Sequence, residues 1–155
     1  MAELITLCRE AGFQDVRTYI ASGNIVFSSE LSQQAVQAEL EQRLTGHMGK
    51  PATLILRTMD ELSALLEANP FPLAAPNHTL VTCLSAPPPA DALSHITNKN
   101  AEDIILGTRE IYVHDPHGIG ASKLKIPVAA KGTARNINTL KKLLEIAQAI
   151  DRNFA

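Results

Sequence analysis

The sequence has 155 residues, of which 45% are hydrophobic and 19% are charged, and its net charge is −2. This composition excludes an intrinsically disordered chain, which would carry fewer apolar residues and more net charge. No stretch approaches the ~20 apolar residues of a membrane-spanning helix. A chain of this length buries roughly 70% of its unfolded surface, so it needs neither a disulfide nor a metal to fold.

The first residues and the cysteines predict a cytoplasmic protein. Residues 1–4 lack the basic region and the apolar run of a signal peptide. Cys8 and Cys83 form no Cys-x-x-Cys pattern, so neither a zinc site nor a redox motif is indicated. Buried free thiols fit a reducing compartment. We therefore expect no cofactor, no metal and no contact with a membrane.

Apolar periodicity and turn residues predict the elements of the first half of the chain. Leu4, Ile5 and Cys8 share a helical stripe, Ser32 is a helix N-cap, and Asn69 before a proline ends a helix. The predicted elements in chain order are a helix over 1–11, strands over 16–20 and 25–27, a helix after 32, a strand over 54–56 and a helix after 58.

The second half restarts with a strand after a proline-rich linker. A run of three prolines precedes a short helix that contains Leu93 and Ile96, and Gly107 lies at the turn of a second hairpin. The predicted elements are a strand over 79–84, this short helix, strands over 103–106 and 110–114, and a helix over 138–151.

These elements predict an α+β fold with two subdomains. The order is α-β-β-α-β in the first half and β-α-β-β-α in the second, and each resembles a split β-α-β-β-α-β unit that lacks a strand. We expect an incomplete N-terminal ferredoxin-like subdomain over residues 1–69, a linker over 70–78, and a C-terminal ferredoxin-like subdomain with a C-terminal helix over 79–155.

Four motifs resemble the DUF1697 family of proteins of unknown function. They are the stretch from Gly12 to Phe27 (GFQDVRTYIASGNIVF), Asn69-Pro70-Phe71, Gly118 with Ser122-Lys123-Leu124, and Thr133-Ala134-Arg135-Asn136-Ile137-Asn138-Thr139. They occur in the family's order and span nearly the whole chain. The resemblance implies a pair of ferredoxin-like units and implies no activity.

The resemblance also implies a missing first strand. Family members begin with a strand and a glycine-rich turn before the helix that opens this sequence. In a ferredoxin-like sheet that strand is central, and its loss leaves backbone groups unpaired on two neighbouring strands. We expect an N-terminally shortened form, from a misplaced start or a real truncation.

The strongest electrostatic signal is a window without acids. Residues 116–144 carry six basic residues and no acid, whereas residues 1–115 are net acidic. The window contains no aromatic residue, which argues against a platform for stacking single-stranded nucleic acid. A basic face for phosphates and a simply solvated face both remain open.

The end of this window predicts a site for a small anion. A helix N-terminus favours negative charge, and Arg135 can clamp a phosphate or carboxylate with two hydrogen bonds. Lys123 and Lys131 would add positive charge. The expected ligand-binding residues are Ser122, Lys123, Lys131, Thr133, Arg135, Asn136, Asn138 and Thr139. The alternative is structural: Asn138 caps the last helix, and Arg135 pairs with a carboxylate of the first subdomain.

The other motifs give weaker evidence for a functional site. His114-Asp115-Pro116-His117 offers too few ligands for a structural zinc site. Neither cysteine lies in a setting that activates a thiol. The best interpretation is a non-catalytic binding module for a phosphate- or carboxylate-bearing ligand. The alternatives are an enzyme acting on such a ligand, and a nucleic-acid or protein interaction module that uses the face 116–144.

Overall fold

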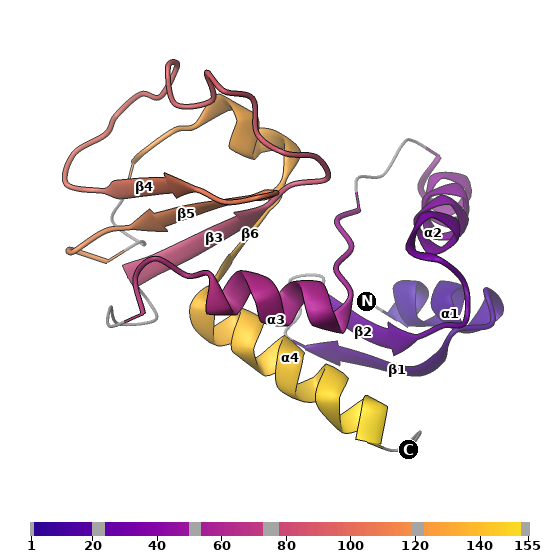
Figure 1. Ribbon diagram of the computed structural model, residues 1–155. Helices are drawn as coiled ribbons and strands as arrows, with labels where there is room; N and C mark the ends of the chain where they lie inside the picture. Colours follow the sequence, from indigo (N-terminus) through magenta and orange to yellow (C-terminus); the bar gives the residue numbers. More distant parts are fainter. Residues whose placement is uncertain (1, 20–23, 50–53, 73–77, 119–122, 153–155) are drawn as a thin grey trace. The chain divides into compact units, whose positions relative to one another are not determined.

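A computed structural model describes residues 2–19, 24–49, 54–72, 78–118 and 123–152 (Figure 1). The predicted mixed α+β class is confirmed, with helices and two small antiparallel sheets in these residues. The chain divides into two compact units. Unit 1 comprises Met1–Met59 and Lys142–Ala155, and unit 2 comprises Asp60–Lys141. The boundary predicted at 70–78 stays a prediction.

Unit 1 is built on a β-hairpin that follows a helix. The helix α1 (Ala2–Glu10) is followed by Gly12, whose φ of 88° places it in the left-handed region that glycine adopts without strain. The strands β1 (Gln14–Tyr19) and β2 (Asn24–Ser28) pair antiparallel. The Asn24 side chain donates a hydrogen bond of 3.1 Å to the Tyr19 carbonyl, which closes the hairpin at this end.

The helix α2 (Gln33–Met48) has a residue at each end that satisfies backbone groups. The Ser32 hydroxyl accepts a hydrogen bond of 3.2 Å from the Ala35 N–H, as predicted for the N-cap. Gly49 is left-handed with a φ of 72°, and its N–H donates to the Thr45 carbonyl. These caps explain why the helix begins and ends at these residues.

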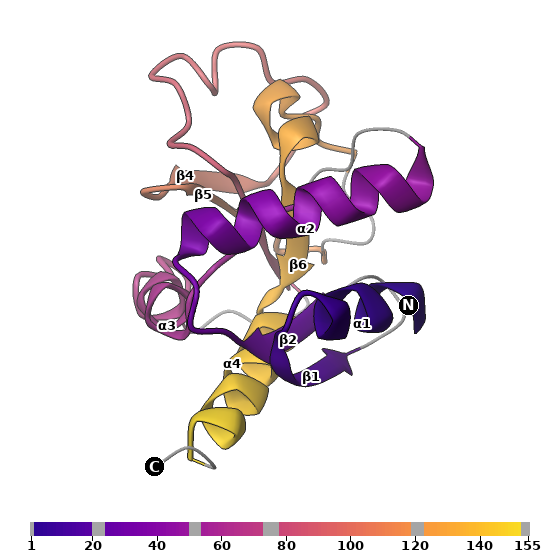
Figure 2. The ribbon, with the colours of Figure 1, turned by 90° about the vertical axis from the view of Figure 1, so that its right-hand side faces the viewer.

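The core of unit 1 lies between the hairpin and the two helices. Cys8, Phe13, Val16, Val36 and Leu40 are buried together. The ring of Phe13 stacks on the ring of Phe27 with centroids 4.5 Å apart. Both ribbon views place α1 and α2 on the same side of the hairpin (Figure 2). This core is small, since a hairpin alone offers only one short apolar face.

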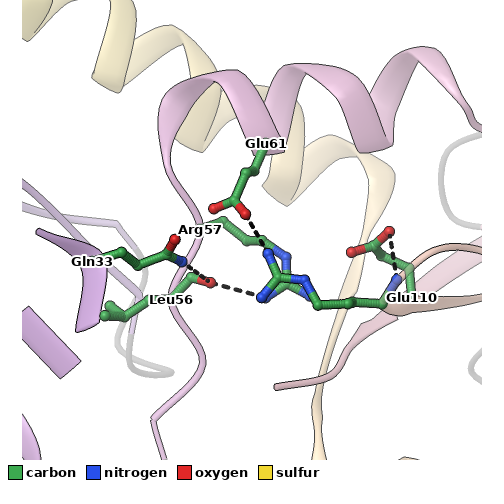
Figure 3. Close-up of polar contacts among 6 residues, drawn as sticks. Gln33, Leu56, Arg57, Glu61 and Glu110 are labelled. Atoms are coloured by element: carbon green, nitrogen blue, oxygen red, sulfur yellow. Dashed lines mark hydrogen bonds and ion pairs between the residues drawn. The ribbon is translucent and has the colours of Figure 1, made fainter. Parts of the chain in front are cut away.

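The strand predicted over residues 54–56 does not form. These residues are in no ladder with any other described residue. Leu54 and Leu56 still pack against the core of unit 1, so their apolar character is used. The Leu54 carbonyl accepts a hydrogen bond of 3.0 Å from the side chain of Gln37 in α2. The Leu56 carbonyl accepts one of 3.3 Å from the side chain of Gln33 (Figure 3). This apolar segment therefore packs against the core of unit 1 without joining a sheet, because glutamine side-chain amides rather than a neighbouring strand donate hydrogen bonds to its carbonyls.

Unit 2 is built on a four-stranded antiparallel sheet. Its order is β4-β5-β3-β6, with β4 at one edge and β6 at the other (Figure 1). The strands are β3 (Thr79–Cys83), β4 (Asp103–Leu106), β5 (Glu110–His114) and β6 (Thr133–Asn136). The helices of this part of the chain are α3 (Met59–Glu67), the short 3-10 helix η3 (Pro127–Lys131) and α4 (Ile137–Arg152), which begins in unit 2 and continues into unit 1.

The two faces of this sheet make different contacts. Ile111 and Val113 on one face pack with Leu84 and with the apolar residues of 124–129. On the other face, the Tyr112 hydroxyl donates a hydrogen bond of 2.7 Å to the carbonyl of Leu65 in the last turn of α3. That carbonyl is one of the four at a helix C-terminus that have no partner within the helix, so Tyr112 ties α3 to the sheet.

The prediction of a short helix around Leu93 and Ile96 is wrong. The segment forms only turns, with i+3 hydrogen bonds from Ala92 to Pro89 and from Ser94 to Asp91. The prolines at 87–89 supply no N–H groups and fix their own φ. Two apolar residues then do not suffice to extend a nucleus of one turn into a helix.

Gly132 lets two backbone segments approach closely. A Cβ at this position would overlap with the carbonyl oxygen of Cys83 and would lie 2.8 Å from the Leu84 side chain. Gly132 therefore connects η3 to β6 at a point where only a glycine fits beside β3.

Candidate functional site

The junction of β6 and α4 carries five of the predicted ligand-binding residues. Thr133 and Arg135 lie on β6, opposite Cys83 and Val81 of β3. Asn136 ends the strand, and the other two residues, Asn138 and Thr139, lie in the first turn of α4. All five belong to unit 2. The structure therefore brings these residues to one strand-to-helix turn.

The helix N-cap at this junction is Asn136. Its Oδ1 atom accepts a hydrogen bond of 2.9 Å from the Thr139 N–H, the geometry of an N-cap with the third residue of the helix. The alternative in which Asn138 caps the helix is therefore wrong. Asn138 is exposed, and Thr139 is buried. One of the first-turn N–H groups is thus already occupied by the protein's own side chain.

Arg135 is half-buried on β6. Its Nη1 atom donates a hydrogen bond of 2.8 Å to the carbonyl of the preceding residue, Ala134. This contact orients one edge of the guanidinium, which carries five N–H donors in all. The guanidinium remains charged at any pH at which proteins fold.

The predicted lysines are placed less completely. Lys123 is exposed and precedes Leu124, which packs against the core of unit 2. Nearby, Lys125 and Thr97 form a bridge with two backbone hydrogen bonds of 2.9 Å. Ser122 and the side chain of Lys131 lie outside the described residues. Of these three predicted residues, only Lys123 has a described side chain. No described contact joins it to the β6–α4 junction.

A row of polar side chains crosses the other edge of the same sheet and was missed in the sequence. Asp103, His114 and Thr79 are neighbours across β4, β5 and β3. The Nδ1 atom of His114 lies 3.9 Å from Oδ2 of Asp103, and the ring of Phe71 stacks on His114 with centroids 5.2 Å apart. The predicted hairpin turn at 107–109 already placed Asp103 opposite His114, so this pair could have been found.

This row does not make a nucleophilic site. Thr79 is only 1% exposed, and its hydroxyl has no hydrogen-bond partner among the described residues. A substrate cannot reach a hydroxyl that is covered in this way. The neighbouring Asp115 accepts a hydrogen bond of 2.8 Å from the His117 N–H and so shapes the loop. Among the described residues, no group of three His, Cys, Asp or Glu side chains can hold a metal ion.

Cys8 is equally unsuited to catalysis. It is fully buried in the core of unit 1, and this burial raises the pKa of its thiol from 9.0 to about 11. A thiol rather than a thiolate is therefore present at neutral pH, and only the thiolate is nucleophilic.

Two further features, an ion pair and a hollow, involve none of the residues of the junction. Arg109 forms an ion pair with Glu61 of α3 in unit 2, and the buried Glu110 accepts a hydrogen bond of 3.4 Å from the Arg109 N–H (Figure 3). A half-open, mostly apolar hollow of about 240 Å³ lies in unit 1. Arg17, Thr18, Ile146, Ala149 and Ile150 line it, so none of the predicted ligand-binding residues does.

The described residues define a class by their fold: a mixed α+β protein with a hairpin unit and a four-stranded antiparallel unit. A family model described as "Protein of unknown function (DUF1697)" matches residues 1–112. The chain therefore belongs to the DUF1697 family, as its motifs predicted.

A solved structure with a similar fold has been found by comparison. It is described as the structure of the conserved bacterial protein SP0830 from Streptococcus pneumoniae, and it is 23% identical to this chain with a TM-score of 0.78. The similarity covers 95% of this chain and 88% of that one. No curated protein matches the chain. In the described residues, no helix has the length and apolar character needed to cross a membrane.

Proposed function

We propose that this protein is a non-catalytic binding module for a small anionic ligand that carries a phosphate or carboxylate group. The observation that supports the proposal is the β6–α4 junction, where Arg135 lies two residues before a helix of sixteen residues whose first turn contains the exposed Asn138. The stretch 116–144, which includes the junction, contains no acid.

The chemistry of the junction favours a compact anion. The N–H groups of the first two helical residues, Ile137 and Asn138, have no acceptor within the helix, and the helix dipole adds positive potential at the same end. Asn138 adds a side-chain amide, and Lys141 and Lys142 are exposed in the following turn. A phosphate or carboxylate would accept from the helix end and would be attracted by the charged guanidinium of Arg135.

The test is a titration of the chain with inorganic phosphate, AMP and citrate, followed by thermal shift and by the amide signals of 133–142 in NMR spectra. Binding at a concentration of 100 times Kd should stabilise the fold by about 2.7 kcal/mol. Arg135→Ala should weaken this binding at least tenfold, whereas Arg9→Ala, which removes an exposed arginine from α1, should leave it unchanged.

Two results would count against the proposal. If none of the three anions shifts the melting temperature, the junction is a structural turn. If Arg9→Ala weakens binding as much as Arg135→Ala, the effect is one of general charge. Binding of RNA or DNA that falls steeply with salt would instead favour the interaction module.

Three finer expectations belong to the same proposal. The order β4-β5-β3-β6 supports a ferredoxin-like plan for unit 2, although the described residues between its strands form only the 3-10 helix η3 and no α-helix. The buried free thiols Cys8 and Cys83 support a cytoplasmic location. Lys123 and Lys131 would add positive potential at the bound anion.

A further inference from the structure

The described strands leave four sheet edges, and they differ in how they are protected. Natural proteins protect an edge with charged residues or by covering it. The edge strand β1 carries Asp15 and Arg17, and β6 carries Arg135. The residues of β2 are all buried or half-buried.

The edge strand β4 carries a charged residue only at its start. Its sequence is Asp103-Ile104-Ile105-Leu106, and its only described ladder is the one with β5. Ile105 is 46% exposed, and it is one of two large hydrophobic side chains that are this exposed among the described residues. An edge strand with no second ladder among the described residues and with an exposed isoleucine is suited to pairing with another strand.

The chemistry of β4 matches that of a second copy of itself. Two copies of an edge strand that pair antiparallel are related by a two-fold axis perpendicular to the sheet, because only this axis reverses the strand and keeps the two faces of the sheet aligned. With the axis at Ile105, the two Ile105 side chains lie directly opposite each other on one face. Ile104 then lies opposite Leu106 on the other face.

This register also keeps like charges apart. Asp103 lies opposite Gly107 of the second copy, which has no side chain, so the two carboxylates of the pair are roughly 13 Å from each other along the strands. The other edge strand of the same sheet is less suited to self-pairing, because two copies of β6 would bring two arginines at position 135 onto one short ladder.

We propose that β4 pairs with β4 of a second copy of this chain and joins two four-stranded sheets into one of eight strands. The interface is short, so the dimer is weak and transient rather than obligate. The inference is independent of anion binding, because β4 and β6 are opposite edges of the sheet.

The experiment measures the solution mass by sedimentation over about 10 µM to 1 mM, a range that spans weak association. The weight-average mass should rise from the monomer value of 16.7 kDa toward twice that value. Ile105→Lys should weaken association at least tenfold. The matched control is Leu31→Lys, which alters the other exposed large hydrophobic residue, at 50% exposure in unit 1, and should leave association unchanged.

A cross-linking measurement tests the register independently of any effect on folding. Directly opposed Cβ atoms are about 4.5–5.5 Å apart, close to the ~3.8 Å of a disulfide. Ile105→Cys should therefore oxidise to a covalent dimer, and Asp103→Cys should not. The native thiols Cys8 and Cys83 are buried and do not compete. A chain that is monomeric at about 1 mM, an Ile105→Lys variant that associates as well as the wild type, or equal cross-linking of the two cysteine variants would each overturn the proposal.

Discussion

The two units each contain a small sheet, and they bury it in different ways. In unit 1 the sheet is one hairpin, and residues of α1 and α2 supply much of the core around Leu40. In unit 2 the sheet has four strands, with apolar contacts on one face and the Tyr112 bond to α3 on the other. A two-stranded hairpin is marginal on its own. Unit 1 is therefore held by side-chain packing, whereas a continuous backbone ladder adds to the stability of unit 2.

The largest expected effect comes from the core of unit 1. Leu40 is 1% exposed, and Leu40→Ala should lower the free energy of unfolding by about 2–5 kcal/mol because it leaves a cavity. Hydrogen exchange should show the loss first in amides of unit 1. Leu31→Ala, at an exposed position, should change stability by less than about 0.5 kcal/mol.

If Leu40→Ala raised the hydrogen-exchange rates of amides in both units equally, the two units would not differ in how they are held together. The complementary variant is Ile111→Ala, which removes a fully buried side chain from unit 2. It should raise exchange in the strands of unit 2 before those of unit 1. Equal responses to both variants would mean that the chain unfolds as a single cooperative unit.

The next effect depends on pH and also lies in unit 1. Burial raises the pKa of the Cys8 thiol from 9.0 to about 11. Between these values the unfolded chain has released this proton and the folded chain still holds it, so the free energy of unfolding falls as pH rises. The stabilisation is complete below pH 9 and declines by about 2–3 kcal/mol by pH 11.

Urea unfolding at pH 8 to 11 measures this decline. Cys8→Ala should remove its share of the slope, so the difference between wild type and variant isolates this thiol from the lysines and tyrosines that titrate in the same range. A slope that is identical in both proteins would show that Cys8 is solvated in the folded state.

A smaller effect tests the backbone of unit 2. Gly132→Ala should lower the free energy of unfolding by about 1–3 kcal/mol, because the new Cβ would displace the backbone of β3 at Cys83. The control is Gly46→Ala in α2, where no atom lies within 4 Å of an added Cβ. That change should stabilise the protein by about 0.5–1 kcal/mol through helix propensity. Two variants of equal stability would disprove the close approach.

The smallest effect concerns the start of α2. Ser32→Ala removes the hydroxyl that accepts from the Ala35 N–H and should destabilise unit 1 by about 1 kcal/mol. The melting temperature measures the change, and the exposed Ser85 provides the control substitution to alanine. A loss no larger than that of the control would mean that water caps the helix equally well.

Local chemistry predicted those elements whose partners lie nearby in the sequence. The second hairpin forms at the residues predicted for it, because alternation and Gly107 specify both strands and the turn together. Ser32 caps its helix for the same reason. The strand over 54–56 failed, because a strand requires a partner that no local pattern supplies, and here Gln33 and Gln37 meet its carbonyls.

The candidate site was predictable to a similar extent. The sequence placed Arg135 and Asn138 at the entry to the last helix, and the structure puts them there. It could not distinguish Asn136 from Asn138 as the cap, since both are good N-cap residues and the choice depends on where β6 stops pairing with β3. The row of Asp103, His114 and Thr79 required the register of three strands, two of which meet only through long-range pairing.

The discontinuous make-up of unit 1 has a consequence for synthesis on the ribosome. Unit 1 combines Met1–Met59 with Lys142–Ala155, whereas unit 2 is one uninterrupted stretch. The N-terminal part of unit 1 therefore leaves the ribosome first but must wait for the second half of α4. At about 5–20 residues per second, translation of the intervening Asp60–Lys141 takes on the order of 4–16 s. During that interval β1 is without Ile146, Ala149 and Ile150, which line a hollow with Arg17 and Thr18 in the finished unit.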